Sequence, residues 1–156
     1  MVPGDIPDLH GEMWIPFAPV AKGRPRFMKG RVVTPKKTRE AEEIIREFVF
    51  YHHIIKEPLD YPLAVSIRFF FSGNPKHYHT RKPDVDNLAK LVLDSLGPKI
   101  HTYLGVRTLG KGILYNDDCQ IVSLMVDKYY HKTQGIWLQW KTMPNLFAVK
   151  HPLEKE

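Results

Sequence analysis

The chain has 156 residues, of which 43% are hydrophobic and 26% are charged, and this balance predicts one globular domain with a hydrophobic core. Its apolar runs are too short to span a bilayer, and the N-terminus lacks the basic-then-apolar pattern of a signal peptide. The single cysteine, Cys119, excludes an intrachain disulfide and a cysteine-based zinc site. We therefore expect a cytoplasmic protein that does not act at a membrane.

Positive charge exceeds negative charge, with 23 lysines and arginines against 17 aspartates and glutamates, a net charge of +6 and a pI near 9.4. Much of the excess falls in one early stretch that has no acid before Glu40. This stretch is either a solvated hairpin and helix start or a contact surface for a polyanion, and its crowding favours the polyanion. Its basic residues are Lys22, Arg24, Arg26, Lys29, Arg31, Lys36, Lys37 and Arg39.

The first part of the chain predicts three strands and a helix. Residues 1–11 read as a flexible lead-in, and residues 12–17 predict a strand at a sheet edge, because Pro16 cannot donate to a ladder. Residues 26–33 predict a hairpin around Lys29 and Gly30. Thr34 and Pro35 predict the start of a helix that closes at residues 56–58. Its predicted apolar stripe consists of Ala41, Ile44, Ile45, Phe48 and Val49.

Residues 62–71 predict a strand that is half-buried on one face, since Leu63, Val65, Ile67 and Phe69 alternate with more polar positions. A polar loop, residues 73–81, follows with His77 and His79. Two histidines at this spacing can bind a transition metal, but no third ligand of matching type lies nearby in the sequence. We interpret them as loop histidines near a phosphate.

The second part predicts a helix over residues 85–96, with Leu88, Leu91, Val92 and Leu96 on one face and Gly97-Pro98 as its end. Residues 97–111 receive no assignment. Residues 113–116, 120–130 and 136–141 predict three strands, with Cys119 as a small buried residue and residues 151–156 as a frayed tail. The buried positions of the middle strand are Ile121, Leu124 and Val126. The resulting β-β-β-α-β-α-β-β-β order predicts a single-domain α+β fold with a mixed sheet and two main helices.

Two carboxylates stand at the start of the second predicted helix. Pro83 biases Lys82 towards extended backbone, so Asp84 and Asp86, two residues apart on extended chain, point the same way. Lys90 follows Asp86 by four residues, which places it one turn into the helix on the same side.

A second acidic pair, Asp117 and Asp118, closes the apolar run 112–116, and we interpret the two acidic places as one metal site. Two unit charges about 4 Å apart repel by about 4 kcal/mol at an effective dielectric of about 20. Lys90 offsets only part of that repulsion, so a bound cation or proton uptake must compensate the rest. Carboxylate oxygens favour Mg²⁺, with Mn²⁺ as a substitute, over zinc or copper.

Such a cation keeps positions open for water and phosphate oxygens, and it activates a water for attack on a phosphodiester. Lys90 would either stabilise the charge of the phosphorane or protonate the leaving group, and the residues leave both roles open. Because arginine and lysine accompany the acids, the natural substrate is a nucleic-acid backbone.

Each acidic pair also has a purely structural explanation. Asp84 and Asp86 can cap a helix, one by accepting backbone N–H bonds and the other by favouring the helix dipole. Asp117 and Asp118 can form a turn between strands. Asp94, well down the helix, reads as a structural or supporting residue. The occurrence of both pairs in one compact domain favours the functional interpretation.

Three motifs occur in order over roughly residues 16–126. They are a basic opening (KGRPRF at 22–27 and TPKKTR at 34–39), then KPDVDNLAK at 82–90 with LDSL at 93–96, and GILYNDDCQIV at 112–122. Together they resemble the RusA-like Holliday junction resolvases, and the basic opening is similar to that of prophage-type members.

The resemblance implies a homodimeric, Mg²⁺-dependent endodeoxyribonuclease that resolves four-way DNA junctions by paired symmetric nicks in recombination and repair. Asp84 and Asp86 match the family's metal-binding aspartates, Asp118 its third catalytic aspartate and Asp117 a supporting neighbour at the metal. Lys90 matches its catalytic lysine. The residues that match a general DNA-binding region are Lys22, Arg24, Arg26, Lys36, Lys37, Arg39 and Lys82.

One departure from the family pattern lies between residues 96 and 117, where the family usually has a much shorter connection. The segment 97–111 need not displace Asp118, because loop length costs little once both ends are anchored. Two alternatives to a resolvase stay open: a flap- or branch-directed metal nuclease on the same scaffold, and a non-catalytic DNA-binding protein whose acids cap helices.

Overall fold

The structure, a computed structural model, describes residues 6–52, 57–104, 106–144 and 152–153. A four-stranded sheet is built in the order β1 (His10–Ile15), β8 (Gly135–Thr142), β4 (Leu63–Ser72) and β7 (Ile121–His131). Strands β4 and β7 are parallel and the other neighbours antiparallel, so the sheet is mixed, as predicted. β1 lies at an edge of the sheet, which confirms the expectation drawn from the proline at position 16.

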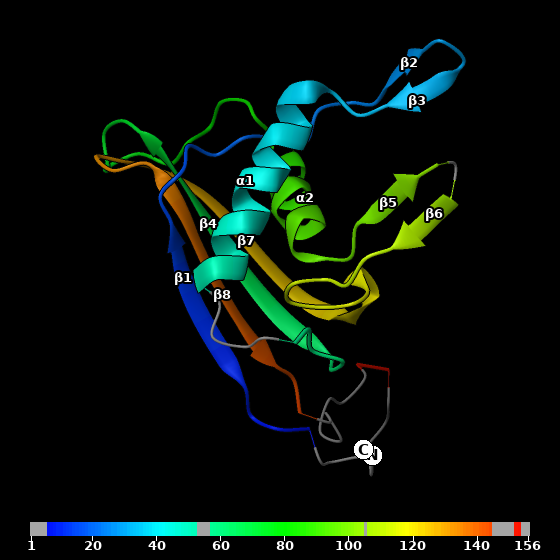
Figure 1. The fold of residues 1–156 in the computed structure, drawn as a ribbon. Coiled ribbons are helices and arrows are strands. Elements are labelled where there is room, and N and C mark those ends of the chain that lie inside the picture. Colours follow the sequence, from blue (N-terminus) through cyan, green and yellow to red (C-terminus); the bar gives the residue numbers. More distant parts are fainter. Residues whose placement is uncertain (1–5, 53–56, 105, 145–151, 154–156) are drawn as a thin grey trace.

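Two helices, α1 (Lys36–His52) and α2 (Val85–Leu96), lie over one face of this sheet (Figure 1). Strand side chains alternate between faces, so every second residue of β4 enters the core beneath the helices. The predicted stripe of α2 is fully buried there. In α1 the prediction is wrong for Ile44, which is 48% exposed, whereas Ile45 and Val49 are buried. Two helices on a mixed sheet confirm the predicted α+β class.

Two hairpins extend away from the sheet beyond the helices (Figure 1). The first, β2 (Arg26–Met28) with β3 (Arg31–Val33), confirms the predicted hairpin around Lys29 and Gly30. The second, β5 (Ile100–Tyr103) with β6 (Val106–Leu109), occupies the segment that received no assignment. The observed order after α2 therefore contains four strands, whereas the sequence predicted three.

The strand predicted at residues 113–116 is wrong. Ile113 and Leu114 are buried, and their backbone N–H groups both donate to the Leu96 carbonyl at the end of α2, at 2.9 and 3.0 Å, rather than to a neighbouring strand. The only ladder contact of this segment within the described chain is an isolated bridge between Leu59 and Tyr115. The apolar run thus packs under a helix end, which periodicity alone does not distinguish from a short strand.

Three further predictions need correction. The lead-in is ordered from Leu9 onwards, because its N–H donates to the Thr142 hydroxyl at 3.0 Å and β1 begins at the next residue. Leu124 is 47% exposed, since β7 forms the other edge of the sheet. Cys119 is exposed in a turn that precedes β7.

Some predictions fall outside the described residues. The end of the first helix was placed at residues 56–58, and the structure describes α1 to His52 and the chain again from residue 57. Most of the tail at 151–156 is likewise not described. Within the described ranges, no helix is both long and apolar enough to cross a membrane.

Candidate active site

A solvent-open hollow of about 470 Å³ lies between α2 and the start of β7. Four ionisable side chains line it: Asp86, Lys90 and Asp94 from α2, and Asp118 from the turn before β7. We call this the acidic hollow. Its apolar lining consists of Val85, Ala89, Leu93, Leu124 and Val126. Two motifs that lie far apart in the sequence therefore meet at one place.

The spacing within α2 explains why three of these side chains share the hollow. Asp86, Lys90 and Asp94 recur every four residues, so they project from one face of the helix while the apolar face packs on the sheet. Eight residues correspond to about 12 Å of helix. The acidic hollow therefore runs along α2, with Asp86 towards the helix N-terminus and Asp94 two turns further on.

Asp118 is held by a single-turn 3₁₀ helix, η1 (Asp118–Gln120), which Asp117 caps. The Asp117 carboxylate accepts the Cys119 N–H at 3.0 Å, and the Gln120 side-chain oxygen accepts the Asp117 N–H at 2.9 Å. The first of these bonds lowers the pKa of Asp117 below its ordinary value. Asp117 thus has the structural role that the sequence left open, and the turn presents Asp118 to the hollow.

Buried Tyr115 lies behind the hollow and connects its two sides. Its hydroxyl donates to the Leu93 carbonyl of α2. Burial, followed by the nearby charges of Asp118 and Asp94, raises the pKa of Tyr115 far above its ordinary value. The segment that leads to Asp118 is therefore joined through Tyr115 to the C-terminal half of α2.

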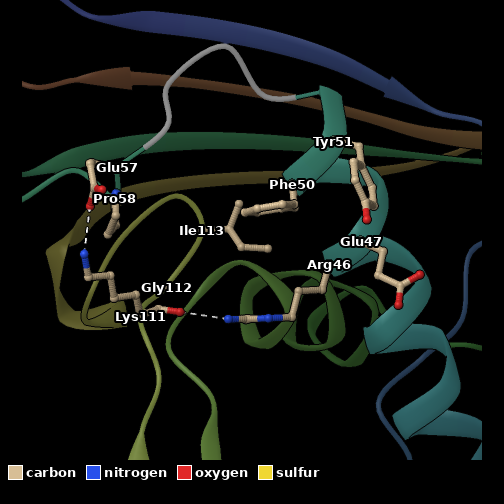
Figure 2. A pocket seen from close by; sticks show the side chains of 9 residues that line it. All are labelled: Arg46, Glu47, Phe50, Tyr51, Glu57, Pro58, Lys111, Gly112 and Ile113. Carbon is tan, nitrogen blue, oxygen red and sulfur yellow. Dashed lines mark hydrogen bonds and ion pairs between the residues drawn. The ribbon is translucent and has the colours of Figure 1, made fainter.

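Arg46 of α1 fixes the segment that leads to this turn. Its guanidinium donates to the carbonyls of Ser95 at 3.3 Å, Gly97 at 2.6 Å and Lys111 at 2.8 Å. Figure 2 shows this side chain reaching from α1 to the Lys111 backbone, with Gly112 next along the chain. The end of α2 and the segment before Tyr115 are thus held by one guanidinium, which donates hydrogen bonds to carbonyl groups at the end of the helix and in that segment.

Asp84 stands at the N-cap position of α2 with extended backbone, yet its side chain makes no capping hydrogen bond. The capping explanation therefore fails for Asp84. Its backbone is positioned by Lys128 of β7, whose ammonium donates to the carbonyls of Arg81 at 2.9 Å and Pro83 at 3.0 Å. Asp84 is exposed beside the first helical turn, which contains Asp86.

Lys22, predicted to bind DNA, forms ion pairs within the fold. Its ammonium pairs with Glu42 and, at 2.8 Å, with Asp94, and its side chain is only 18% exposed. Burial by itself would lower the pKa of Lys22, but the hydrogen bonds and charges of Asp94 and Glu42 outweigh it and raise the pKa. Lys22 therefore joins α1 to the wall of the acidic hollow.

The other basic residues predicted to bind DNA are exposed, and their charges face solvent. These residues are Arg24, Arg26, Lys36, Lys37, Arg39 and Lys82. Lys36 forms a surface pair with Glu40 at 3.6 Å, an arrangement that contributes little to stability and leaves the lysine accessible.

The structure brings together two of the four aspartates predicted as metal ligands. Asp86 and Asp118 line the acidic hollow, joined by Asp94, whereas Asp84 and Asp117 do not line it. Among the residues that the structure describes, no three histidine, cysteine, aspartate or glutamate side chains gather in a way that could hold a metal ion. Asp86 and Asp94 are separated by two turns of α2, so the acids of the hollow are not collected at one point.

Three residues that position the site escaped the sequence analysis: Arg46, Gln120 and Lys128. All three donate hydrogen bonds to backbone groups of distant segments. For Arg46 and Lys128 no local sequence pattern reveals this role. Gln120 is the exception, because an aspartate followed three residues later by glutamine is a capping-box pattern. Gln120 also donates to the carbonyls of Leu59 at 2.7 Å and Tyr61 at 3.1 Å, which fastens the Asp118 turn to the segment just before β4.

The two loop histidines differ in their surroundings. His77 is exposed, whereas His79 is only 7% exposed and stacks on Phe71 with ring centroids 4.0 Å apart. The Nδ1 atom of His79 is buried and has no hydrogen-bond partner among the residues that the structure describes. Burial, with the positive charges of Lys128 and Arg81, lowers the pKa of His79. His79 is therefore a packed residue rather than a phosphate contact.

We expect acid to destabilise the protein through His79. A histidine whose pKa is lower in the folded state stabilises the fold fully above its unfolded pKa, and this contribution is lost as pH falls. Urea unfolding of the wild type should therefore lose free energy between about pH 7 and about pH 5. In His79→Phe this slope should be shallower, whereas His77→Phe, an exposed position, should keep the wild-type slope. Equal slopes in all three proteins would contradict the expectation.

Comparison with known proteins shows the family of this chain. The family model for the endodeoxyribonuclease RusA matches residues 16–105, more than half of the chain. The match includes Asp84, Asp86 and Lys90 and ends before Asp117 and Asp118. None of the curated proteins matches the chain.

The protein is therefore an enzyme that hydrolyses phosphodiester bonds in DNA. The chain belongs to the RusA family of endodeoxyribonucleases, and this family acts on branched DNA.

Proposed function

We propose that this enzyme is a Mg²⁺-dependent, structure-selective endonuclease that resolves Holliday junctions by paired symmetric nicks in DNA recombination and repair. The observation that supports this most strongly is the acidic hollow, where Asp86, Lys90 and Asp118 meet from two parts of the chain. The exposed basic residues, most of them in the β2–β3 hairpin and at the start of α1, would supply the charge that binds further phosphates of the substrate.

The donor set fits Mg²⁺. The acidic side chains of the hollow are all aspartates, so they offer only oxygen ligands. Mg²⁺ is usually held by one or two carboxylates together with water and substrate phosphates, rather than by protein ligands alone. A site with few closely gathered acids is therefore compatible with this cation. Asp86 and Asp118, the two predicted ligands that line the hollow, would hold it. When bound, the cation lowers the pKa of a water and stabilises charge on the phosphate.

The chain's own groups have separate tasks in this proposal. Lys90, exposed on the same face of α2 as Asp86, presents an ammonium to the phosphate, where it stabilises negative charge or protonates the leaving oxygen. Asp94 is held by Lys22 at 2.8 Å, so it orients the wall of the hollow rather than contacting the phosphate. Asp117 and Gln120 keep the Asp118 turn in place.

Paired nicks require two active sites related by two-fold symmetry, and each chain supplies one hollow. We therefore expect the active enzyme to be a homodimer, since a two-fold dimer matches the symmetry of a four-way junction.

A cruciform extruded in a supercoiled plasmid tests this function. Paired nicks across the junction within one binding event convert the plasmid directly to a linear product, whereas independent nicks give nicked circles first. We expect linear product with Mg²⁺, none with chelator, and little cutting of a relaxed plasmid without a cruciform. Cutting that survives chelation, or equal cutting of both plasmids, would overturn the proposal.

A further inference from the structure

The β2–β3 hairpin carries large apolar side chains that nothing in the described chain covers. Phe27 is 76% exposed, Val32 is 70% exposed and Met28 is 54% exposed. Its turn, Lys29 and Gly30, has positive φ at both positions, 50° and 75°, as two-residue hairpin turns prefer. The hairpin is thus a well-formed element whose apolar groups face solvent, and exposed apolar groups in a cluster usually mark a contact surface.

The register divides the hairpin into two faces. Phe27 lies directly opposite Val32, and Met28 lies directly opposite Arg31. Because facing residues project from the same side of a ribbon and successive residues alternate, Phe27 and Val32 share one face. Arg31 and Met28 lie on the other face, one residue along. The hairpin therefore has one apolar face, formed by Phe27 and Val32, and an opposite face that carries the positive charge of Arg31.

This combination matches the chemistry of DNA with accessible bases. No aspartate or glutamate occurs between Glu12 and Glu40, so the hairpin and its flanks are purely basic. Phosphates attract the arginines, while an apolar side chain gains contact area by entering between base steps, as architectural DNA-binding proteins do. Branch points offer such steps, because stacking is already interrupted there and insertion costs less.

The base of the hairpin is tied to the acidic hollow. The Gly23 N–H donates to the Thr38 hydroxyl at 2.9 Å, and the Lys22 N–H donates to the Asn87 carbonyl at 3.0 Å, one residue after Asp86. The Lys22 ammonium pairs with Asp94 in the wall of the hollow. The hairpin therefore extends from a fixed point, so DNA held on it has a defined position relative to the hollow.

We propose that the β2–β3 hairpin inserts Phe27, with Val32 beside it, between bases at the branch point of the substrate, and holds that point open next to the acidic hollow. Arg26 and Arg31 contact the neighbouring phosphates. The inference rests on the proposed function in one respect, that branched DNA is the substrate.

Fluorescence of 2-aminopurine placed at the branch point tests this insertion, because its emission rises when the base is unstacked. With chelator present, saturating wild-type protein should raise the emission. Phe27→Ala should lose most of this rise while its Kd for the junction changes by less than about threefold, and with Mg²⁺ it should cut roughly tenfold more slowly. Phe50→Ala, a similar exposed phenylalanine (64%) at the far end of α1, should behave as wild type.

The double variant Arg26→Gln/Arg31→Gln should show the opposite result: weaker binding with a reduced salt dependence, and the full emission once saturated. A full rise with Phe27→Ala, or no rise with the wild type, overturns the inference. The inference is also overturned if Phe27→Ala keeps the full rise in emission but loses binding to anionic lipid vesicles, because the hairpin would then contact a lipid surface. Wild-type cutting of the same junction with Mg²⁺ is scored separately, so failure of the proposed function is distinguished from failure of the inserted wedge.

Discussion

Asp86→Asn is expected to bind a four-way junction at least as well as the wild type and to cut it at least about 10³-fold more slowly. The substitution removes a carboxylate that would hold the cation, and loss of several kcal/mol of transition-state stabilisation corresponds to a rate factor of this size. Binding improves or stays equal because a negative charge near the phosphates disappears. Single-turnover cleavage and a gel-shift titration measure the two effects, and Asp118→Asn should behave in the same way.

A matched control lies on β7, the strand that follows the Asp118 turn. Asp127 of β7 pairs in register with Arg68 of β4, on the sheet face opposite the helices. Asp127→Asn should therefore cut at the wild-type rate. Thermal melts should show all three variants folded, because Asp86 and Asp118 are exposed. Wild-type cutting by Asp86→Asn, or loss of folding that Mg²⁺ does not affect, would contradict a catalytic role.

Gly112→Ala is expected to destabilise the fold by about 3 kcal/mol or more. A Cβ at this position would lie 1.6 Å from the carbonyl oxygen of Tyr115 and 3.3 Å from the carbonyl carbon of Gly97. Both neighbours are backbone, so the segment must move as a whole, and Tyr115 with it. Urea unfolding measures the loss, and cutting should fall as well because the displaced segment carries Asp118.

Gly30→Ala is the corresponding control. Gly30 has open space around a new Cβ but a φ of +75°, so alanine there should cost only about 1–2 kcal/mol through backbone strain in an exposed hairpin. If Gly112→Ala unfolds at the wild-type urea concentration, the close contact with Tyr115 does not limit this segment as described.

The sequence predicts the fold best where burial and periodicity coincide. The alternation in β4 and the helical period of the apolar residues in α2 each indicate a single buried face, and both elements lie where they were expected. The run 113–116 was predicted wrongly as a strand because its apolar residues are buried beside the end of α2, where the backbone bonds to the helix end rather than to a neighbouring strand. The β5–β6 hairpin escaped assignment because it lies outside the periodic core.

The candidate site is predictable in composition but not in arrangement. The motifs contain Asp86, Lys90 and Asp118, and the structure places all three in one hollow. The spacing from Asp117 to Gln120 is that of a capping box and marks Asp117 as the cap, but no spacing indicates that the turn brings Asp118 to the hollow beside α2. Lys22 reads as a DNA contact until the positions of Glu42 and Asp94, both distant in sequence, are known.

The attachment at Lys22 and Gly23 also indicates which residues can vary without disturbing the active site and which cannot. The bonds to Asn87, Thr38 and Asp94 come from Lys22 and Gly23, which lie outside the hairpin, so we expect that residues 26–33 can be exchanged without disturbing the helix that bears the acids. A library randomised over residues 26–33 should therefore yield enzymes that accept different DNA shapes through an unchanged chemical step. Such modularity would let related enzymes diverge in target while sharing one reaction centre.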